Sequence, residues 1–531
     1  MAVVRDQSKL RGGYYTPAPV ADFLVDWAVP NGEARVLEPS AGDGAFVGAA
    51  SGRLSSGSID AVELFDFEAS KIRDLALSNV NVVSGDVFSW YSERADGTYD
   101  AAVGNPPFIR YQTFPEKHRE RGFALMHQVG LRPNRLTNAW VPFVVLATRA
   151  LRPGGRLAMV LPAELLQVNY ASELREYLAR NYSELSVITF RRLVFDGIQQ
   201  ETVLLLGVRS IDDHAAMSFL QLESAAELGS KTLEDVERVN VDLDHGREKW
   251  IQYYLSAREL GLIRELERSD ALTTLGDLAQ VDVGIVTGRN EFFVLRPSEA
   301  DELGVREFCL PLVGRSAQVP GLELRLDEWH ALVQADGKCL LLQLGRTPRS
   351  ELSPESLAYV ERGESLGYHT GYKCRIRLPE WWFVPSVTVP DAFLLRQIHD
   401  GPRIITNHAR ATCTDTIHRV RVNHGVDPDW LAAASMNSVT FAFSEIRGRS
   451  YGGGVLELEP NEADGLPFPR PREALPLPDL DLWTRRKEAD QILDEVDRLV
   501  LQDCGITSVE SAVIRDVWRK LSRRRMARKR R

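Results

Sequence analysis

The stretch Val36-Leu37-Glu38-Pro39-Ser40-Ala41-Gly42-Asp43-Gly44 decides the fold of the first part of this chain. An apolar run ends at Glu38, a proline and two glycines form a tight turn, and a helical pattern begins near Ala45. Glycines at 42 and 44 let a ligand approach the backbone closely, because they carry no β-carbon. The N–H groups of the following helix start face the same place. Such a turn also occurs as an ordinary strand–helix connection, so its neighbours must decide what it binds.

Short apolar runs alternate with helical stretches around this turn. The runs are residues 35–38, 59–63, 80–83, 99–103 and 156–161, and the helical stretches include 141–150 and 171–180. This alternation predicts an α/β fold with a doubly wound, mostly parallel sheet. Two closely spaced runs, 185–190 and 201–208, predict a final strand pair suited to antiparallel pairing. The sequence therefore predicts a seven-stranded sheet.

Composition divides the chain into four expected parts. Residues 1–210 form the sheet domain, and the charged stretch 211–270 predicts a helical connector. Residues 271–470 are richer in Pro, Trp and turn residues and predict a mixed α/β domain. Residues 471–531 return to a helical period and end in a basic tail, which we interpret as solvated or as a phosphate contact.

Global composition excludes several classes of protein. The 531 residues, 44% hydrophobic and 26% charged, are typical of globular domains. No uninterrupted apolar stretch is long enough for a membrane span, so no membrane partner is expected. Five scattered cysteines suit a reducing cytoplasm. Apart from the basic tail, nothing in the sequence looks eukaryotic, so we expect a cytoplasmic prokaryotic protein. No His/Cys grouping has metal-ligand spacing, so no metal is expected. The net charge of −10 lowers the expectation of a nucleic-acid partner without excluding it.

Acidic residues follow the second and third predicted strands. Glu63 stands where a carboxylate can accept both hydroxyls of a ribose, as in doubly wound nucleoside-binding sheets. Asp86 follows the third strand, where an acid can accept from an adenine amine beside an apolar neighbour, Val87. Together with Glu38 they put three acids at three successive strand ends. This pattern favours a nucleoside-containing ligand over three solvated loop residues.

The fourth strand is followed by Asn105-Pro106-Pro107-Phe108. Both prolines fix φ, so this hairpin is rigid. The Asn105 side-chain carbonyl and the Pro106 backbone carbonyl can each accept one N–H of an aromatic amine. That draws the nitrogen toward tetrahedral geometry and frees its lone pair to attack a methyl sulfonium, with no strong base needed. Phe108 can stack on a base taken out of its duplex.

With these motifs in place, the chain resembles the gamma class of S-adenosylmethionine-dependent DNA adenine-N6 methyltransferases of restriction-modification systems. The first motif of that family matches Arg11-Gly12-Gly13-Tyr14-Tyr15-Thr16-Pro17, and Leu151-Arg152-Pro153-Gly154-Gly155-Arg156 matches the segment before the fifth strand. The resemblance covers about residues 11–470, strongly up to 210 and weakly beyond. It implies a methyltransferase sheet, a C-terminal target-recognition domain, double-stranded DNA as partner, and base flipping of the target adenine. A separate restriction endonuclease or other defence-system partner is compatible with it.

The resemblance also assigns roles to individual residues. Thr16 would hold the methionine end of the cofactor and Glu38 its amine, while Phe195 in Val194-Phe195-Asp196-Gly197 would lie against the flipped adenine. The expected catalytic residues are Asn105, Pro106, Pro107, Phe108 and Phe195. The expected residues for S-adenosyl-L-methionine are Tyr15, Thr16, Glu38, Ser40, Ala41, Gly42, Gly44, Glu63, Asp86, Val87, Asn105 and Pro107. The chain departs from the family at Phe108, where Tyr is commoner, and at Gln199-Gln200-Glu201-Thr202.

In the third part, 283–293 resembles the opening of the target-recognition domain and 452–458 a segment near its close. Candidate base readers are the basic and aromatic residues between Tyr372 and Trp382, then Arg403, Asn407 and Arg410. Trp381 and Trp382 are interpreted as core.

Two alternatives stay open. An Asn-Pro-Pro-aromatic hairpin also serves methylation of protein glutamine or RNA guanine, although such enzymes tend to be shorter. A non-catalytic DNA-specificity subunit could keep the fold, but it would be expected to lose the cofactor motifs, and Glu63, Asp86 and Asn105 are all present. No nuclease motif is evident, so any nuclease is expected on a separate chain.

Overall fold

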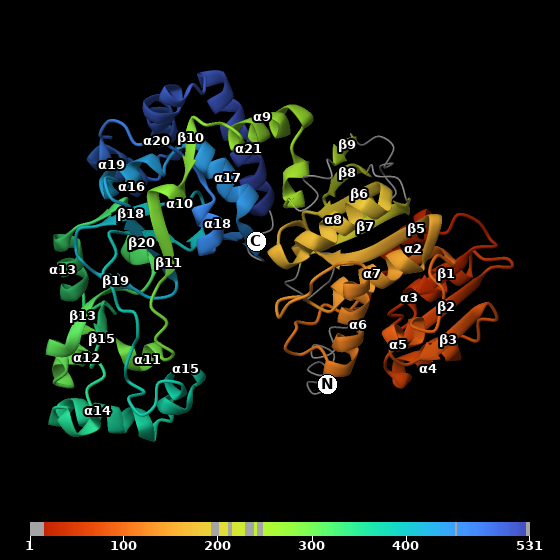
Figure 1. The fold of residues 1–531 in the computed structure, drawn as a ribbon, viewed down its shortest axis with the longest axis horizontal. Coiled ribbons are helices and arrows are strands. Elements are labelled where there is room, and N and C mark those ends of the chain that lie inside the picture. The colour runs from red at the N-terminus through yellow and green to blue at the C-terminus, as the bar shows by residue number, and fades with distance from the viewer. Residues whose placement is uncertain are drawn as a thin grey trace. The chain divides into compact units, whose positions relative to one another are not determined.

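The computed structural model describes residues 15–192, 201–210, 215–228, 238–241, 248–451 and 454–526. The described residues form two compact units, one within residues 15–257 and the other within residues 258–526. Figure 1 draws the first unit in red to yellow and the second in green to blue.

The first unit is built on one nine-stranded sheet, of order β3-β2-β1-β4-β5-β7-β6-β8-β9. Pairing is parallel from β3 to β5, β7 is antiparallel to both of its neighbours, and β6 pairs parallel with β8. The strands are β1 Arg35–Glu38, β2 Ser58–Glu63, β3 Val80–Ser84, β4 Tyr99–Gly104, β5 Leu151–Pro162, β6 Tyr182–Phe190, β7 Thr202–Arg209, β8 Ala215–Leu222 and β9 Arg238–Val241. The doubly wound, mostly parallel sheet and its antiparallel strand are thus confirmed, with β8 and β9 added to the predicted seven.

Helices cover both faces of this sheet (Figure 1). On one face, α2 and α3 pack on alternate strand residues such as Val36, Ala101 and Val160, which form a single buried cluster. On the other face, α7 contacts β4 and β5, and α8 contacts β6. Strands covered on both sides are mostly apolar, as the sequence runs indicated. The helices are α2 Ala18–Ala28, α3 Ala45–Ser51, α4 Asp66–Asp74, α5 Val87–Tyr91, α6 Glu116–Gln128, α7 Trp140–Ala150 and α8 Ser172–Asn181.

The expected helical connector, residues 211–270, differs from the structure. Its first part forms β8, whose Met217, Leu220 and Leu222 are buried against the sheet. The only α-helix between residues 211 and 270 in the described part is α9, Ala257–Glu267. Without β8, strand β6 would be an edge strand with unpaired backbone N–H and C=O groups. β8 pairs with seven residues of β6. The many charged residues in 211–247 obscure the alternation of apolar and polar residues that is typical of a strand.

The second unit combines small sheets with helices. A five-stranded sheet has the order β11-β20-β16-β18-β14, and a four-stranded sheet the order β12-β15-β13-β19. The strands are β10 Leu272–Thr274, β11 Ala279–Val283, β12 Val294–Leu295, β13 Cys309–Val313, β14 Glu323–Leu324, β15 Leu340–Leu342, β16 Ala392–Leu395, β17 Gln397–Ile398, β18 Ile404–Asn407, β19 Thr412–Cys413, β20 Ile417–Val422, β21 Arg449–Tyr451, β22 Val455–Glu457 and β23 Pro467–Pro469. The helices are α10 Leu275–Leu278, α11 Asn290–Phe293, α12 Pro297–Glu302, α13 Leu326–Gln334, α14 Pro354–Ser365, α15 Tyr372–Arg375, α16 Pro428–Ala434, α17 Ser438–Arg447, α18 Pro460–Asp464, α19 Leu477–Arg486, α20 Ala489–Val496 and α21 Ser508–Met526.

The basic end of the chain is integrated into the second unit as far as residue 526. The last turns of α21 pack on α17, and the Arg525 side chain is only 2% exposed. Its guanidinium Nη2 donates to Glu445 Oε1 at 2.6 Å and to the His399 carbonyl at 2.8 Å. The interpretation of this stretch as a solvated tail is therefore wrong for Arg524 and Arg525, which are buried. Residues 527–531 lie outside the described part of the chain.

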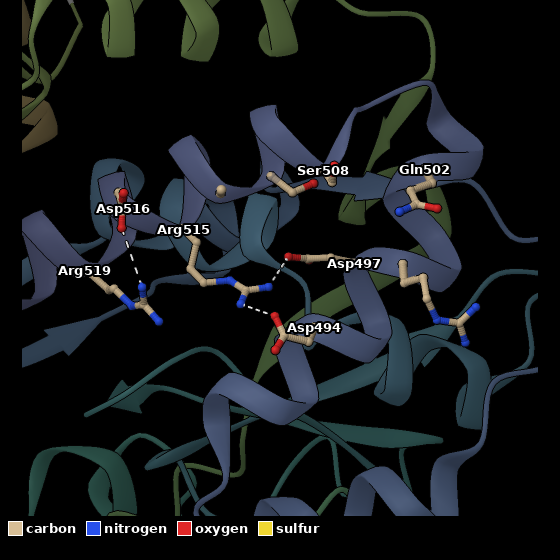
Figure 2. Close-up of a pocket in the computed structure, with 10 residues that line it drawn as sticks. Asp494, Asp497, Gln502, Ser508, Arg515, Asp516 and Arg519 are labelled. Atoms are coloured by element: carbon tan, nitrogen blue, oxygen red, sulfur yellow. Dashed lines mark hydrogen bonds and ion pairs between the residues drawn. The ribbon is translucent and has the colours of Figure 1, made fainter.

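A pocket of about 300 Å³ lies between α20, α21 and the π-helical turn Asp497–Leu501 (Figure 2). Arg515 points into it between Asp497, at 2.8 Å, and Asp494, and Arg519 pairs with Asp516. Burial raises the pKa of Asp497, which also accepts from the backbone N–H of Ser438. The acidic and basic side chains of this pocket pair with one another. These ion pairs join the terminal helices.

No helix within the described residues is long and apolar enough to cross a bilayer.

Candidate active site

The strand order of the first unit reverses between β1 and β4. The chain runs outward from β1 to β3 on one side and from β4 to β5 on the other. At such a switch point the loops after the two strands diverge and leave a crevice at their carboxyl ends, which is where open α/β sheets bind ligands. The loops that diverge here are 39–44 and 105–108, the two stretches that the sequence singled out.

Asn105 is held by two segments that are distant in sequence. Its Nδ2 donates to Thr16 Oγ1 at 3.2 Å, and its backbone carbonyl accepts from Ser40 Oγ at 3.3 Å. Thr16 is buried and lies two residues before the first residue of α2. The amide is thus oriented through its nitrogen, and its carbonyl Oδ1 is a group of the kind that can accept an N–H.

The rest of the hairpin is firmly packed. Pro106 is buried, and Pro107 is half-buried. Phe108 is also half-buried and packs against the cluster formed by α2 and the sheet, so one side of its ring is supported. The backbone N–H of Ala139 donates to the Ile109 carbonyl at 2.9 Å, which ties the exit of the hairpin to the start of α7.

Glu38, the last residue of β1, is a buried carboxyl group that lacks a full set of partners. It is 1% exposed, and its Oε2 has no hydrogen-bond partner among the described residues. Burial raises its pKa well above the usual value, and the charges of Asp43 and Glu63 raise it further, while a hydrogen bond from the Val47 backbone N–H lowers it. An orphaned carboxylate oxygen at this depth fits a cationic ligand group.

Glu63, the last residue of β2, is joined to the turn after β1. Its Oε2 accepts from the Gly42 N–H and its Oε1 from the Phe65 N–H, both at 2.9 Å. Burial raises its pKa, and these two hydrogen bonds lower it. Each oxygen keeps a further acceptor position, so the carboxylate is oriented but can still accept from two ligand hydroxyls.

The two glycines of the turn have different roles. Gly42 has φ of +53°, and a β-carbon there would meet no atom within 4 Å, so the backbone at this point borders open space. Gly44 has φ of +87°, and a β-carbon there would approach Ile72 Cγ1 to 3.1 Å. Gly42 is therefore the position that admits a ligand, whereas Gly44 permits the packing of α4. Ala41 is buried and its N–H donates to the Val62 carbonyl.

Asp86 is more engaged than the sequence indicated. Its Oδ1 accepts from the Phe88 N–H and caps α5. Its Oδ2 pairs with Arg121 Nη1 at 2.7 Å and lies 3.2 Å from His118 Nδ1, both on α6. Val87 is buried beside it. Any ligand amine at Asp86 has to share the carboxylate with Arg121, a pairing between residues 35 positions apart that no local pattern reveals.

Of the expected residues, Tyr15 pairs with a residue of α4, and Phe195 is not described. Tyr15 is 54% exposed, and its hydroxyl donates to Glu68 Oε1 at 3.1 Å. Phe195 lies outside the described residues, as do residues 11–14 of the first motif and the segment from 194 to 200.

A half-buried polar cluster near the hairpin is not indicated by any of the sequence motifs. Asn138 Nδ2 donates to Glu164 Oε2 and to the Tyr170 hydroxyl, both at 2.9 Å, and Trp140 Nε1 donates to the same hydroxyl. Glu164 follows the end of β5, so an acid directly after a buried strand was the available signal. The cluster fixes the segment whose Ala139 N–H holds the hairpin.

Two of the expected base readers in the second unit are occupied internally. Asn407 donates to the carbonyls of Pro390 and Ala411 and accepts from the Ala411 N–H. Arg403 donates to the Pro320 carbonyl, and burial lowers its pKa. Arg410 is exposed. Trp381 and Trp382 are 1% and 2% exposed, as expected for core residues.

Comparison with known proteins gives matches in both units. A family model described as Eco57I restriction-modification methylase matches residues 60–195, and one described as Type II methyltransferase M.Eco57I, C-terminal domain, matches residues 247–501. The chain belongs to the restriction-modification methyltransferases. M.AccI of Acinetobacter calcoaceticus is 24% identical to this methyltransferase over 469 residues, which are 85% of this chain and 83% of that protein. M.XamI of Xanthomonas campestris pv. amaranthicola is 26% identical over 476 residues, which are 86% of this chain and 85% of that protein.

One solved structure resembles the methyltransferase in fold, and a second match is weaker. The DrdV–DNA complex is 10% identical with a TM-score of 0.51, and the match covers 90% of this chain and 57% of that chain. The type IIG restriction endonuclease BpuSI is 13% identical with a TM-score of 0.39, and 65% of its chain is covered. The methyltransferase therefore spans less than two thirds of either chain.

The Thr16–Asn105 hydrogen bond gives a first testable prediction. Thr16→Val keeps the shape of the side chain and removes the acceptor, so the amide loses its orienting partner. We expect kcat for methyl transfer to fall about tenfold, the equivalent of one hydrogen bond, with cofactor affinity unchanged. Thr16→Ser should retain near wild-type kcat. Weaker cofactor binding at unchanged kcat would instead assign Thr16 to the cofactor.

Proposed function

We propose that the protein is a site-specific DNA adenine-N6 methyltransferase that uses S-adenosyl-L-methionine. The target adenine is flipped out of the duplex into the crevice after β1 and β4. The single observation that carries the proposal is the Asn105 hairpin at this switch point, with its amide oriented by Thr16 and its carbonyl by Ser40. The membership in the restriction-modification methyltransferases supports DNA as substrate.

The residues present fit the cofactor. The orphaned Glu38 Oε2 suits the cofactor's amine, and Glu63, oriented by Gly42 and Phe65, suits the two ribose hydroxyls. The open space at Gly42 lets a ligand lie against the backbone. Asp86 suits the adenine amine if it shares its carboxylate with Arg121. When bound, S-adenosylmethionine supplies a methyl group on a sulfonium, which makes that methyl electrophilic.

The hairpin acts on the nucleophile. In an aromatic amine the nitrogen lone pair is delocalised into the ring, so the amine is a poor nucleophile. Asn105 Oδ1 and the Pro106 carbonyl each accept one N–H, which favours the tetrahedral nitrogen and localises the lone pair. Because both acceptors are fixed before the base arrives, the rate gain comes from orientation and electrostatics.

Aromatic side chains complete the proposed base pocket. Phe108 is supported on one side by the α2 cluster and can stack on the flipped ring with the other. Phe195 is proposed for the opposite face from the family motif alone.

The proposal is tested by incubating plasmid DNA with the protein and radiolabelled cofactor, then mapping modified bases by single-molecule sequencing. The expected result is methyl-adenine at one recurrent sequence. Label that enters RNA or protein while DNA stays unmodified would favour the glutamine or guanine alternatives, and DNA binding without any transfer would favour the non-catalytic specificity subunit.

The Glu63 carboxylate gives a second testable prediction. Glu63→Ala removes the acceptor of the ribose hydroxyls, so the dissociation constant of the cofactor should rise about tenfold, and DNA affinity should change much less. Isothermal titration calorimetry with cofactor and fluorescence anisotropy with duplex DNA measure the two. A larger loss of DNA affinity than of cofactor affinity would remove Glu63 from this role.

A further inference from the structure

The surface around α15 exposes an unusual set of large apolar side chains. Tyr372 is 65% exposed, Ile376 59%, Leu378 54%, and Val286, on a different loop, 37%. Solvent-exposed groups of this kind are a sign of an interaction site when they gather on neighbouring loops. We call this set, with the cations described below, the α15 patch.

The two loops that carry the α15 patch are fixed to each other. Arg377 donates from Nη1 to the Thr287 carbonyl and from Nη2 to the Val286 carbonyl, both at 2.8 Å. Gly288 has φ of +87°, and a β-carbon there would lie 2.7 Å from Lys373 Cβ. The buried Cys374 anchors α15 in the core of the unit. The patch is therefore preorganised, and binding to it would cost little ordering entropy.

Three cations surround these apolar side chains. Arg289, Lys373 and Arg375 are exposed, and within the described part of the chain none of them has a carboxylate at ion-pair distance. Arginines elsewhere in the unit differ, since Arg349 contacts Glu361 and Glu364, and Arg515 in Figure 2 lies between two aspartates. In a chain with a net charge of −10, this is a local concentration of uncompensated positive charge.

We propose that the α15 patch contacts the target DNA, with Lys373 and Arg375 on backbone phosphates and Tyr372 and Ile376 against base edges in a groove. This inference rests on the proposed function. A DNA groove presents anionic phosphates on either side of partly apolar base edges, which is the combination that the patch complements. Phosphate contacts position the duplex, and the apolar contacts contribute sequence discrimination.

The test measures duplex DNA binding by fluorescence anisotropy over a series of salt concentrations, using the intact protein and the site found by methylation mapping. For the double variant Lys373→Ala/Arg375→Ala we expect a shallower slope of log K against log salt. The change should correspond to the loss of about two phosphate contacts. Affinity should fall at least tenfold near physiological salt, with cofactor affinity and melting temperature unchanged. Arg349→Ala is the matched control, because it removes an exposed but acid-paired cation of the same unit and should leave the slope as it is.

A second variant separates the two kinds of contact. Tyr372→Ala should keep the salt slope but reduce the ratio of affinities for the mapped site and an unrelated duplex, by about fivefold or more. An unchanged slope in the double variant, with wild-type protein binding and methylating DNA, would overturn the patch and leave the proposed function standing. Wild-type protein that neither binds nor methylates DNA would overturn both.

Discussion

Asn105→Ala should reduce methyl transfer by about a thousandfold or more, while the dissociation constant of the cofactor changes by no more than about twofold. The variant removes the carbonyl that accepts an N–H of the target amine, and the backbone carbonyl of Pro106 cannot localise the lone pair alone. Burst kinetics with a short duplex, together with calorimetry for the cofactor, measure both quantities. The loss should appear in kcat, because the interaction develops with the transition state.

Thr16→Val provides the matched comparison for this experiment. It leaves the Asn105 carbonyl in place and removes only the bond that orients the amide, so its loss of kcat must be much smaller. A rate for Asn105→Ala close to the wild type, with intact folding, would contradict the mechanism.

Glu38→Gln should weaken cofactor binding about a hundredfold and yet stabilise the cofactor-free protein at neutral pH. The buried carboxyl has a folded-state pKa well above its usual value, so the folded protein holds this proton more tightly than the unfolded chain does. Its contribution to stability is therefore favourable at low pH and is lost as the pH rises above the ordinary Glu value toward the raised one. Glutamine stays neutral and avoids that loss.

Thermal unfolding of the cofactor-free proteins between about pH 5 and pH 8 tests the stability half of this prediction. The melting temperature of Glu38→Gln should exceed that of the wild type by a margin that grows with pH. Calorimetry tests the binding half. A variant that is less stable than the wild type at pH 8, or that binds the cofactor equally well, would argue against a cation-binding role for Glu38.

The central sheet could be predicted because its strands are buried on both faces. Runs such as Tyr99–Gly104 are apolar apart from Asp100, and each is followed by a turn with polar residues at the carboxyl end. Glu38, Glu63 and Asn105 were placed at one edge by this rule, and the structure brings their loops together through the Gly42 and Ser40 hydrogen bonds. Edge strands obey a weaker pattern, so the sequence predicts a helical connector where the structure has β8.

Long-range polar pairing could not be predicted from the sequence. Asp86 with Arg121, and Asn138 with Glu164 and Tyr170, depend on how helices pack over the sheet. Asn407 has the side chain of a base reader, but its amide is engaged by the Pro390 carbonyl, before β16, and by the backbone of Ala411 in the turn after β18. Local motifs report backbone geometry, whereas these partners are set by tertiary contacts.

The burial of Arg525 against Glu445 has a consequence for engineering new specificities by exchanging modules between relatives. A chimera whose donor segment stops at the apparent end of the recognition region, near residue 470, would separate the two partners of a fully enclosed ion pair and lose about 3–5 kcal/mol. A graft that carries the donor's own terminal helices keeps that pair intact. The exchangeable piece is thus the whole of residues 258–526.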